Sequence, residues 1–192
     1  NFWLKQSKLI KWYKKPSITL KRKTNNFVEW FPDGKLNIFY NCVTKNIKLN
    51  LGEKIAVYFV NKNQEIKSFT YNDLNQKVEN FSDLILQKLK YKKISNAKVI
   101  IHSSASIDAT ISILTCAKLG IHFSVIFEDL AAEAISKRIL LLKPDLFITR
   151  YEEKKFNNQI LNKINIKNKI KFIFLKNEDY FNNKRNVNKT LV

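Results

Sequence analysis

Short apolar runs alternate with helical stripes through the second half of the chain. The runs predict buried strands at Lys98–His102 (KVIIH), His122–Phe127 (HFSVIF), Asp145–Thr149 (DLFIT) and Ile170–Leu175 (IKFIFL). The stretches between them predict helices over 108–119, 131–142 and 156–164. This repeated order predicts parallel strands joined by right-handed crossovers and covered on both faces. We therefore expect an α/β fold with the first half of a doubly wound, mainly parallel sheet.

A β-hairpin and a long helix are predicted before these strands. The run Ile55–Val60 predicts a buried strand, and Ile66–Thr70 returns after a polar loop. Thr70 and Asp73 have the spacing of a capping box at a helix start. The apolar residues that follow lie three or four positions apart and form one stripe on a helix: Leu74, Val78, Phe81, Ile85 and Leu89.

Glycine and proline are scarce, with three of each in 192 residues, and they mark predicted turns. Gly120 is expected just beyond the end of helix 108–119. Pro144 is expected to stop helix 131–142, whose inward residues are predicted to be Ala131, Ile135, Ile139 and Leu142. In the stretch WFPDGKLNIFYNC (30–42), Pro32, Asp33 and Gly34 predict a turn tip with aromatic anchors on both sides.

The first 53 residues predict an N-terminal arm that is partly helical and partly extended. Aromatic residues and lysines are interleaved over residues 1–26, and a short amphipathic helix fits residues 3–14. Such a helix would lie on a larger body or, alternatively, on a membrane surface. Residues 16–29 are polar and are predicted to be extended. Residues 176–192 are polar as well and have no periodic pattern.

The composition favours a globular chain over a disordered or membrane-spanning one. Apolar residues make up 45% of the chain, and its longest apolar stretch, 109–127, is interrupted by Lys118, Gly120 and His122. The formal charge of +19 is compatible with a polyanionic partner or with a lysine-rich solvated surface. The lysines are spread along the whole chain, and the sequence has no RNA-recognition signature, zinc-finger spacing or heptads. We therefore predict no nucleic-acid partner and no membrane span.

The two cysteines, Cys42 and Cys116, have no metal-ligand spacing. They predict two buried, reduced thiols and a cytoplasmic protein. The chain contains no Met and begins Asn-Phe-Trp, which predicts a processed chain or a fragment of a longer protein.

Candidate chemistry is concentrated where the predicted strands end. Ser103–Ser106 follows the first parallel strand and could bind an anion at a helix N-terminus or simply cap that helix. His102 and His122 fall at opposite edges of the predicted sheet, and each is interpreted as a structural histidine with satisfied hydrogen bonds. Glu128 and Asp129 follow the second strand and could bind a metal, although capping of the next helix by Asp129 is favoured. No catalytic residue and no metal site is assigned.

The order of motifs resembles the N-terminal region of short-chain acyl-CoA synthetases of the acetyl-CoA and propionyl-CoA type, within the AMP-forming adenylating superfamily. The resemblance covers about residues 2–150. Its elements are Phe2-Trp3, Ile10-Lys11-Trp12, Trp30–Asn37, Tyr40-Asn41-Cys42, Thr70–Leu74, Leu114–Gly120, Phe123–Phe127, Arg138-Ile139 and Ile148-Thr149. Their order and spacing together identify the chain as similar to this family.

The resemblance implies a carboxylic acid–thiol ligase that uses ATP, coenzyme A and Mg²⁺ to convert acetate or propionate to an acyl-CoA through an acyl-adenylate. Glu128-Asp129-Leu130 replaces the family's Gly-Gly-Phe turn, which lies near the coenzyme A site in relatives, and its carboxylates would repel phosphates. The family's Arg-Gly-Gly-Lys element is not recognisable; Lys154 and Lys155 lie in its vicinity and could substitute. Glu128, Asp129, Lys154 and Lys155 are therefore the expected cofactor-site neighbourhood by resemblance.

The family's glycine-rich phosphate loop, ribose-binding Asp and Arg, and catalytic Lys do not occur in residues 1–192. The resemblance thus implies an N-terminal piece that is inactive alone, binds no cofactor by itself and has the rest of its own synthetase chain as partner. We expect an arm over 1–53, the N-terminal part of an adenylation domain over 54–175 and a polar tail over 176–192. The alternative is a stand-alone basic binding module or a decayed synthetase remnant. Poor solubility is also expected, because the last strands should lack neighbours.

Overall fold

The second half of the chain forms a parallel sheet. The computed structural model describes residues 2–24, 26–61, 63–90, 93–153, 156, 160 and 170–175. Its main sheet contains β5 (Lys98–His102), β6 (His122–Ile126), β7 (Leu146–Thr149) and β8 (Lys171–Phe174) in the order β6-β5-β7-β8. All three pairings are parallel. The predicted α/β class, the parallel direction and all four strands are confirmed.

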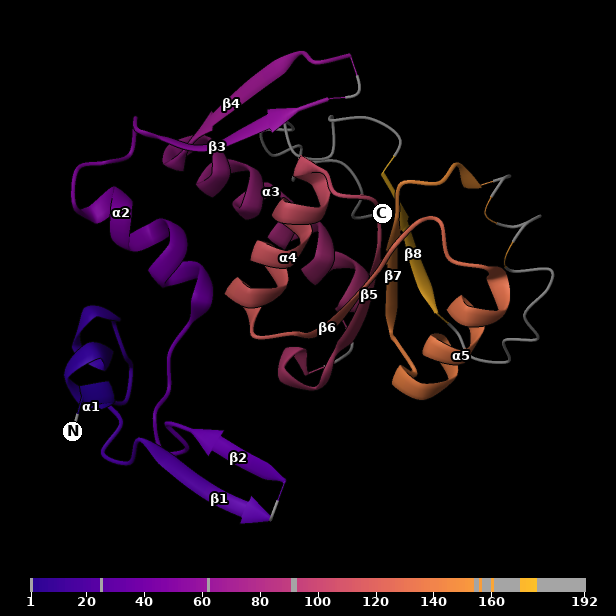
Figure 1. The fold of residues 1–192 in the computed structure, drawn as a ribbon. Coiled ribbons are helices and arrows are strands. Elements are labelled where there is room, and N and C mark those ends of the chain that lie inside the picture. Colours follow the sequence, from indigo (N-terminus) through magenta and orange to yellow (C-terminus); the bar gives the residue numbers. More distant parts are fainter. Residues whose placement is uncertain are drawn as a thin grey trace.

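Helices cover both faces of this sheet, as Figure 1 shows. Helices α3 (Tyr71–Leu89) and α4 (Ile107–Leu119) cover one face, and α5 (Ala132–Leu142) covers the other. Successive β5 side chains alternate between the two cores: Val99 and Ile101 join the cluster with α3 and α4, while Ile100 joins the cluster with α5. This two-sided burial explains why the strand sequences are almost continuously apolar.

The helix ends follow the predicted signals in α3 and α4. The Thr70 hydroxyl accepts a hydrogen bond from the Asp73 N–H at 3.1 Å, and the Asp73 carboxylate accepts one from the Thr70 N–H at 2.9 Å. The predicted capping box is therefore confirmed, and the five stripe residues of α3 are all buried. Gly120 ends α4 with φ of 68°, a left-handed conformation that glycine adopts without strain.

The prediction for the inward residues of α5 is only partly right. Ile135 and Ile139 are buried, and Leu142 packs against the same cluster. Ala131 is exposed and serves as the N-cap of α5, so it does not face the core. The predicted helix over 156–164 and the polar tail over 176–192 lie almost entirely outside the described residues.

The hairpin of β3 (Ile55–Val60) and β4 (Ile66–Thr70) is confirmed, but the predicted burial of its first strand is wrong. The strands pair antiparallel. Val57 and Phe69 pack against the core beside α3, whereas Tyr58 on the opposite face of β3 is 66% exposed. A continuous apolar run predicts a strand that is buried on both faces. It does not reveal that the Tyr58 face of β3 is exposed in this structure.

The N-terminal arm contains a shorter helix than predicted. Helix α1 covers Phe2–Gln6 and continues as a 3-10 turn over Ser7–Leu9, so the predicted helix over 3–14 is wrong at its C-terminal end. The chain becomes extended at Ile10, and Lys14 forms a bridge with Lys35. The Trp12 indole N–H donates to the Ser7 carbonyl at 2.8 Å, which ties the extended segment back to the turn. These long-range contacts override the local helical period.

Residues 16–29, predicted to be extended, contribute to a second hairpin. It joins β1 (Leu20–Thr24) to β2 (Phe27–Trp30) in antiparallel register. Figure 1 shows this hairpin away from the parallel sheet. Residues Tyr40–Thr44 then form a π-helical turn that continues into α2 (Lys45–Lys48).

The stretch WFPDG forms the predicted turn. The Gly34 N–H donates to the Phe31 carbonyl at 2.9 Å and closes a turn whose central residues are Pro32 and Asp33. The Asp33 carboxylate accepts from the Ser17 hydroxyl at 2.7 Å and from the Ser17 and Ile18 N–H groups. Trp12 packs edge-on against Phe31 with ring centroids 5.5 Å apart. The motif thus holds the two halves of the arm together.

Gly34 is required by packing, which gives a testable prediction. A Cβ atom at this position would lie 2.6 Å from the Trp12 ring. Gly34→Ala should therefore cost about 1–3 kcal/mol of arm stability through overpacking. All three tryptophans, Trp3, Trp12 and Trp30, are in the arm, so tryptophan fluorescence during urea unfolding reports on it selectively. The exposed neighbour Lys35→Ala is the matched control; equal midpoints for both variants would contradict the packing argument.

Asp33 should give the arm an acid-dependent stability. Hydrogen bonds, first from the Ser17 hydroxyl and then from the Ser17 backbone, lower the pKa of Asp33 from 3.8 to about 2. The ionised form is therefore favoured in the folded arm, so its contribution is complete above pH 3.8 and is lost as the pH falls toward 2. Asp33→Asn should remove this part of the acid transition of tryptophan fluorescence. Ser17→Ala should move the transition to higher pH, and an unchanged transition in both variants would refute the assignment.

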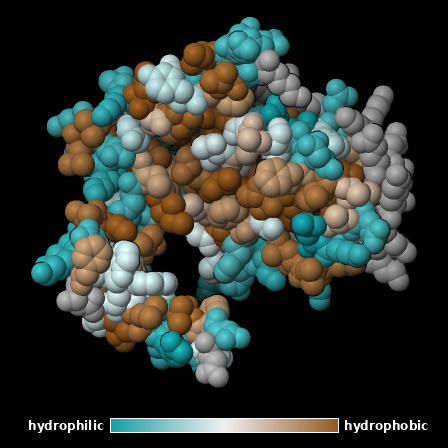
Figure 2. All heavy atoms as spheres, in the orientation of Figure 1, coloured by the Kyte–Doolittle hydropathy of each residue, from teal (hydrophilic) through white to brown (hydrophobic). Residues whose placement is uncertain are grey.

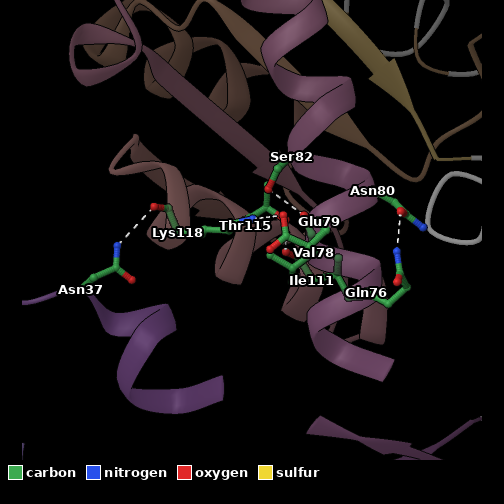
Figure 3. A network of polar contacts seen from close by, with 9 residues as sticks. All are labelled: Asn37, Gln76, Val78, Glu79, Asn80, Ser82, Ile111, Thr115 and Lys118. Atoms are coloured by element: carbon green, nitrogen blue, oxygen red, sulfur yellow. Dashed lines mark hydrogen bonds and ion pairs between the residues drawn. The ribbon is translucent and has the colours of Figure 1, made fainter. Parts of the chain in front are cut away.

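The arm is attached to the core through the end of α4. Figure 3 shows the Asn37 side chain reaching α4, where its amide N–H group donates to the carbonyl oxygens of Ala117 at 2.8 Å and Lys118 at 3.2 Å. These carbonyls belong to the last turn of the helix, where the Ala117 carbonyl also accepts from the Gly120 N–H at 3.4 Å. The Lys118 ammonium in turn contacts the Glu79 carboxylate on α3. Asn37 thus adds a polar link between arm and core to the apolar one made by the buried Phe39 and Val43.

Candidate functional site

Three turns meet at the carboxyl edge of the parallel sheet, because parallel strands all end on the same side. They follow β5 at Ser103–Ser106, β6 at 127–131 and β7 at Arg150-Tyr151. Ligands of open α/β folds bind outside this edge. His122 begins β6, opposite Lys98 at the start of β5, which confirms that it lies at the other edge from His102.

The serine turn caps α4. The Ser106 hydroxyl accepts from the Ala109 N–H at 3.1 Å, which confirms the capping interpretation. The Ser103 hydroxyl is 3.0 Å from the Ser106 hydroxyl and donates to the Ser104 carbonyl at 2.9 Å. The Ser103 N–H donates to the Ile126 carbonyl, which joins this turn to the end of β6. The hydroxyls are therefore already used within the protein, and anion binding here stays a prediction.

His102 is fully buried but only half satisfied. Its Nδ1 atom lies 2.9 Å from the Thr149 hydroxyl, whereas Nε2 has no hydrogen-bond partner in the described part of the chain. The expectation of a fully satisfied structural histidine is therefore wrong for one of its two nitrogens. Burial lowers the pKa of His102, and the nearby Glu128 carboxylate and carbonyl oppose this shift. The imidazole is neutral at pH 7.

Glu128 and Asp129 do not cap α5, so the favoured interpretation of this pair is wrong. The helix begins at Ala132, its N-cap is Ala131, and no side chain caps it. Asp129 lies two residues too early to act as N-cap. The Glu128 carbonyl accepts from the Tyr151 hydroxyl at 2.9 Å, and its carboxylate Oε1 is buried without a hydrogen-bond partner among the described residues. Those residues contain no group of three or more side chains suited to a metal ion.

Tyr151 is the residue that sequence reasoning missed. Its ring packs edge-on against His102 with centroids 4.9 Å apart, and its N–H donates to the Thr149 hydroxyl at 3.1 Å. Burial raises the pKa of Tyr151, and the Glu128 and Asp129 charges raise it further. The sequence does offer one signal for Tyr151: it is an aromatic residue just after a predicted strand, at the sheet edge where ligands of open α/β folds bind. Next to it, Arg150 pairs with Asp108 at the start of α4, with 3.3 Å between Nε and Oδ2.

Neither cysteine belongs to this cluster, and two of the predicted site residues cannot be placed against it. Lys154 and Lys155 lie outside the described residues. Cys116 is buried, and burial raises its pKa to about 12, so it is an unreactive thiol. Cys42 is exposed, which corrects the prediction of two buried thiols; within the same turn Val43, and not Cys42, points into the core. No described helix is long and apolar enough to cross a membrane.

Comparison with known proteins identifies the family. The pattern described as the acetyl-coenzyme A synthetase N-terminus matches residues 1–42, and that of the AMP-binding enzyme family matches residues 46–189. Acetyl-coenzyme A synthetase of Leptospira biflexa is 36% identical over 150 residues, which cover 77% of this chain and 22% of the relative. The human mitochondrial acyl-CoA synthetase short-chain family member 3 is 34% identical over 149 residues, which cover 77% of this chain and 21% of the relative.

A solved structure supports the same fold. Acetoacetyl-CoA synthetase from Streptomyces lividans matches with a TM-score of 0.64 and 19% identity, over 77% of this chain and 22% of that one. The chain thus spans about a fifth of the length of the relatives it matches and aligns with their N-terminal part. The chain belongs to the AMP-binding enzyme family, and its residues 1–42 match the pattern described as the acetyl-coenzyme A synthetase N-terminus.

Proposed function

We propose that this chain supplies the N-terminal part of an AMP-forming short-chain acyl-CoA synthetase that acts on acetate or propionate through an acyl-adenylate. The observation that carries the proposal is the order of the two matched patterns, 1–42 followed by 46–189, on a parallel sheet. In this proposal residues 1–53 are the arm, and residues 54–175 are the N-terminal part of the adenylation domain. A cytoplasmic location goes with the proposal and remains a prediction from the free cysteines.

The described residues do not fit a polyphosphate by themselves. The edge where ligands bind carries Glu128 and Asp129, whose charges act on Tyr151 and would repel phosphates. The hydroxyls of Ser103 and Ser106 in the β5–α4 turn are already engaged. We therefore propose that ATP, coenzyme A and Mg²⁺ are bound only with residues supplied elsewhere in a longer synthetase. Residues 1–192 alone should be catalytically silent, and Glu128, Asp129, Lys154 and Lys155 are proposed as neighbours of the coenzyme A site.

A chimera tests this function. Residues 1–175 are joined to the part of the Leptospira biflexa synthetase that follows the matched region, and ATP–pyrophosphate exchange is measured with acetate, propionate and longer acids. We expect exchange that depends on acetate or propionate in the chimera, and none above the acid-free background in the 192-residue chain. The intact relative is the positive control.

Two results would contradict the proposal. Exchange by the 192-residue chain alone would show that it is not silent. A chimera with native circular dichroism that exchanges with no acid would favour the alternative of a basic binding module or a decayed remnant. The proposed site is tested in the same chimera by replacing Glu128 and Asp129 with glycine, which should lower the KM for coenzyme A.

A further inference from the structure

Two buried polar atoms without partners lie in one cluster at the carboxyl edge. They are His102 Nε2 and Glu128 Oε1, and neither has a hydrogen-bond partner in the part of the chain that the structure describes. His102 is 0% exposed. A buried polar atom without a partner costs free energy, so two such atoms of complementary type in one cluster call for an explanation.

Tyr151 connects the two residues through the His102 ring and the Glu128 backbone carbonyl. Its hydroxyl donates to the Glu128 carbonyl, its ring lies against the His102 ring, and its N–H donates to Thr149. Thr149 in turn contacts His102 Nδ1. The end of β5, the turn after β6 and the end of β7 are thus joined through four residues.

The hydrogen bond to Thr149 allows two positions for the proton on the neutral His102 ring. Because the Thr149 oxygen already accepts the Tyr151 N–H, its own hydroxyl proton is available to His102 Nδ1. With Nδ1 as acceptor the neutral ring carries its proton on Nε2, whereas with Nδ1–H donating to the second lone pair of the Thr149 oxygen the proton is on Nδ1. In the first form the nitrogen without a partner is an N–H donor, and the carboxylate oxygen without a partner is an acceptor.

We propose that His102 is a proton-sensitive element: when it takes up a proton from solvent, the imidazolium pairs with the Glu128 carboxylate and shifts the turn at 127–130 relative to the end of β7. When His102 is protonated, the His102–Glu128 ion pair holds this turn. When His102 is neutral, the hydrogen bond from the Tyr151 hydroxyl to the Glu128 carbonyl holds it. The inference concerns the fold of the edge and does not depend on the proposed synthetase activity.

The other charged groups at this edge do not replace Glu128. Asp129 lies in the same turn, but its charge acts on Tyr151. Arg150, next to Tyr151, would oppose a cation on His102, but its guanidinium is paired with Asp108 on α4. Among the described residues, β7 and residue 156 bring to His102 the uncharged Thr149 hydroxyl and the rings of Phe147 and Phe156, at 5.7 and 6.0 Å between centroids. Glu128 is therefore the carboxylate that should respond.

Nuclear magnetic resonance of the 192-residue chain tests the proposal. The chain has two histidines, so the exposed His122 is an internal reference for the buried His102. We expect burial to hold the His102 midpoint below the ordinary pKa of histidine, and the backbone amides of residues 127–130 to shift with that midpoint. Glu128→Gln should lower that midpoint by about 1 pH unit, as expected for loss of a nearby opposite charge. The matched control, Asp129→Asn, should change it much less.

An unchanged His102 midpoint in Glu128→Gln, or amides at 127–130 that follow His122 instead, would overturn the proposal. The same coupling is measured independently from urea unfolding at pH 5 and pH 7.5. Glu128→Gln should then destabilise more at pH 5, because the carboxylate stabilises only the protonated ring. Equal losses at both pH values would contradict the proposal. Tyr151→Phe should leave the His102–Glu128 coupling in place while removing the hydrogen bond to the turn.

Discussion

Phe81→Ala should lower the free energy of unfolding by about 3–5 kcal/mol, which is a large part of the total stability of a domain of this size. Phe81 lies on the buried stripe of α3 and is completely inaccessible to solvent. It belongs to the core that α3 and α4 form with one face of the sheet. Truncation removes apolar contacts and leaves a cavity, and both effects reduce stability.

Urea unfolding followed by circular dichroism measures this loss. Leu86→Ala on the same helix is the matched control, since Leu86 is 40% exposed, and it should cost about 0.5 kcal/mol, the usual size of a surface effect. If the two variants lost similar amounts of unfolding free energy, the apolar stripe that contains Phe81 would not be the side of α3 that packs against the sheet.

Phe147→Ala should have a comparable effect on the opposite face, again about 3–5 kcal/mol. Phe147 is fully buried in β7, and its ring lies 5.0 Å from Phe156 and 5.8 Å from Phe172 between centroids. These rings and α5 residues form the second core. Phe147→Leu keeps most of the volume and should recover much of the loss. Leu141→Ala, at an 83% exposed position of α5, should be nearly neutral.

A double variant with Phe81→Ala and Phe147→Ala tests whether separate cores cover the two faces of the sheet. Because Phe81 and Phe147 belong to separate clusters, their effects should be additive to within about 0.5 kcal/mol. A strong coupling between them would mean that the chain has one core and not a sheet between two layers.

Exposed apolar side chains remain along one edge of this sheet. In the described part of the chain β6 pairs only with β5, and Phe123, Val125 and Phe127 are exposed. Figure 2 shows apolar side chains across the middle of the face that the molecule turns to the viewer. An edge strand with exposed apolar side chains promotes association, while the expected poor solubility, argued from the last strands, stays a prediction.

The sequence predicts most of the parallel half of the fold because burial there is regular. In the strand Lys98–His102 and the helix with Phe81, apolar positions follow the period of the element, and capping residues mark the ends. The arm is less predictable, because the helix end at Leu9 depends on the distant partner Lys35. The burial of β3 depends on which of its faces α3 covers, and an apolar run carries no such information.

The candidate site was predictable in position but not in detail. Parallel strands place His102 and Glu128 at one edge, so their proximity follows from topology. The exact start of α5, one residue after the exposed Ala131, is not specified by a local cap, and Asp129 was therefore misassigned. Tyr151 was missed because its role depends on a backbone carbonyl in another turn, which residue types do not encode.

The most direct test of the account is the strand register of the sheet, measured from nuclear Overhauser effects in the isotope-labelled chain. The parallel arrangement predicts that Val99 lies opposite Phe123 and Leu146, and that Ile101 lies opposite Val125 and Ile148. Contacts in the reverse order, with Val99 near Ile148 and Ile101 near Leu146, would show antiparallel strands and contradict both the fold and the synthetase assignment.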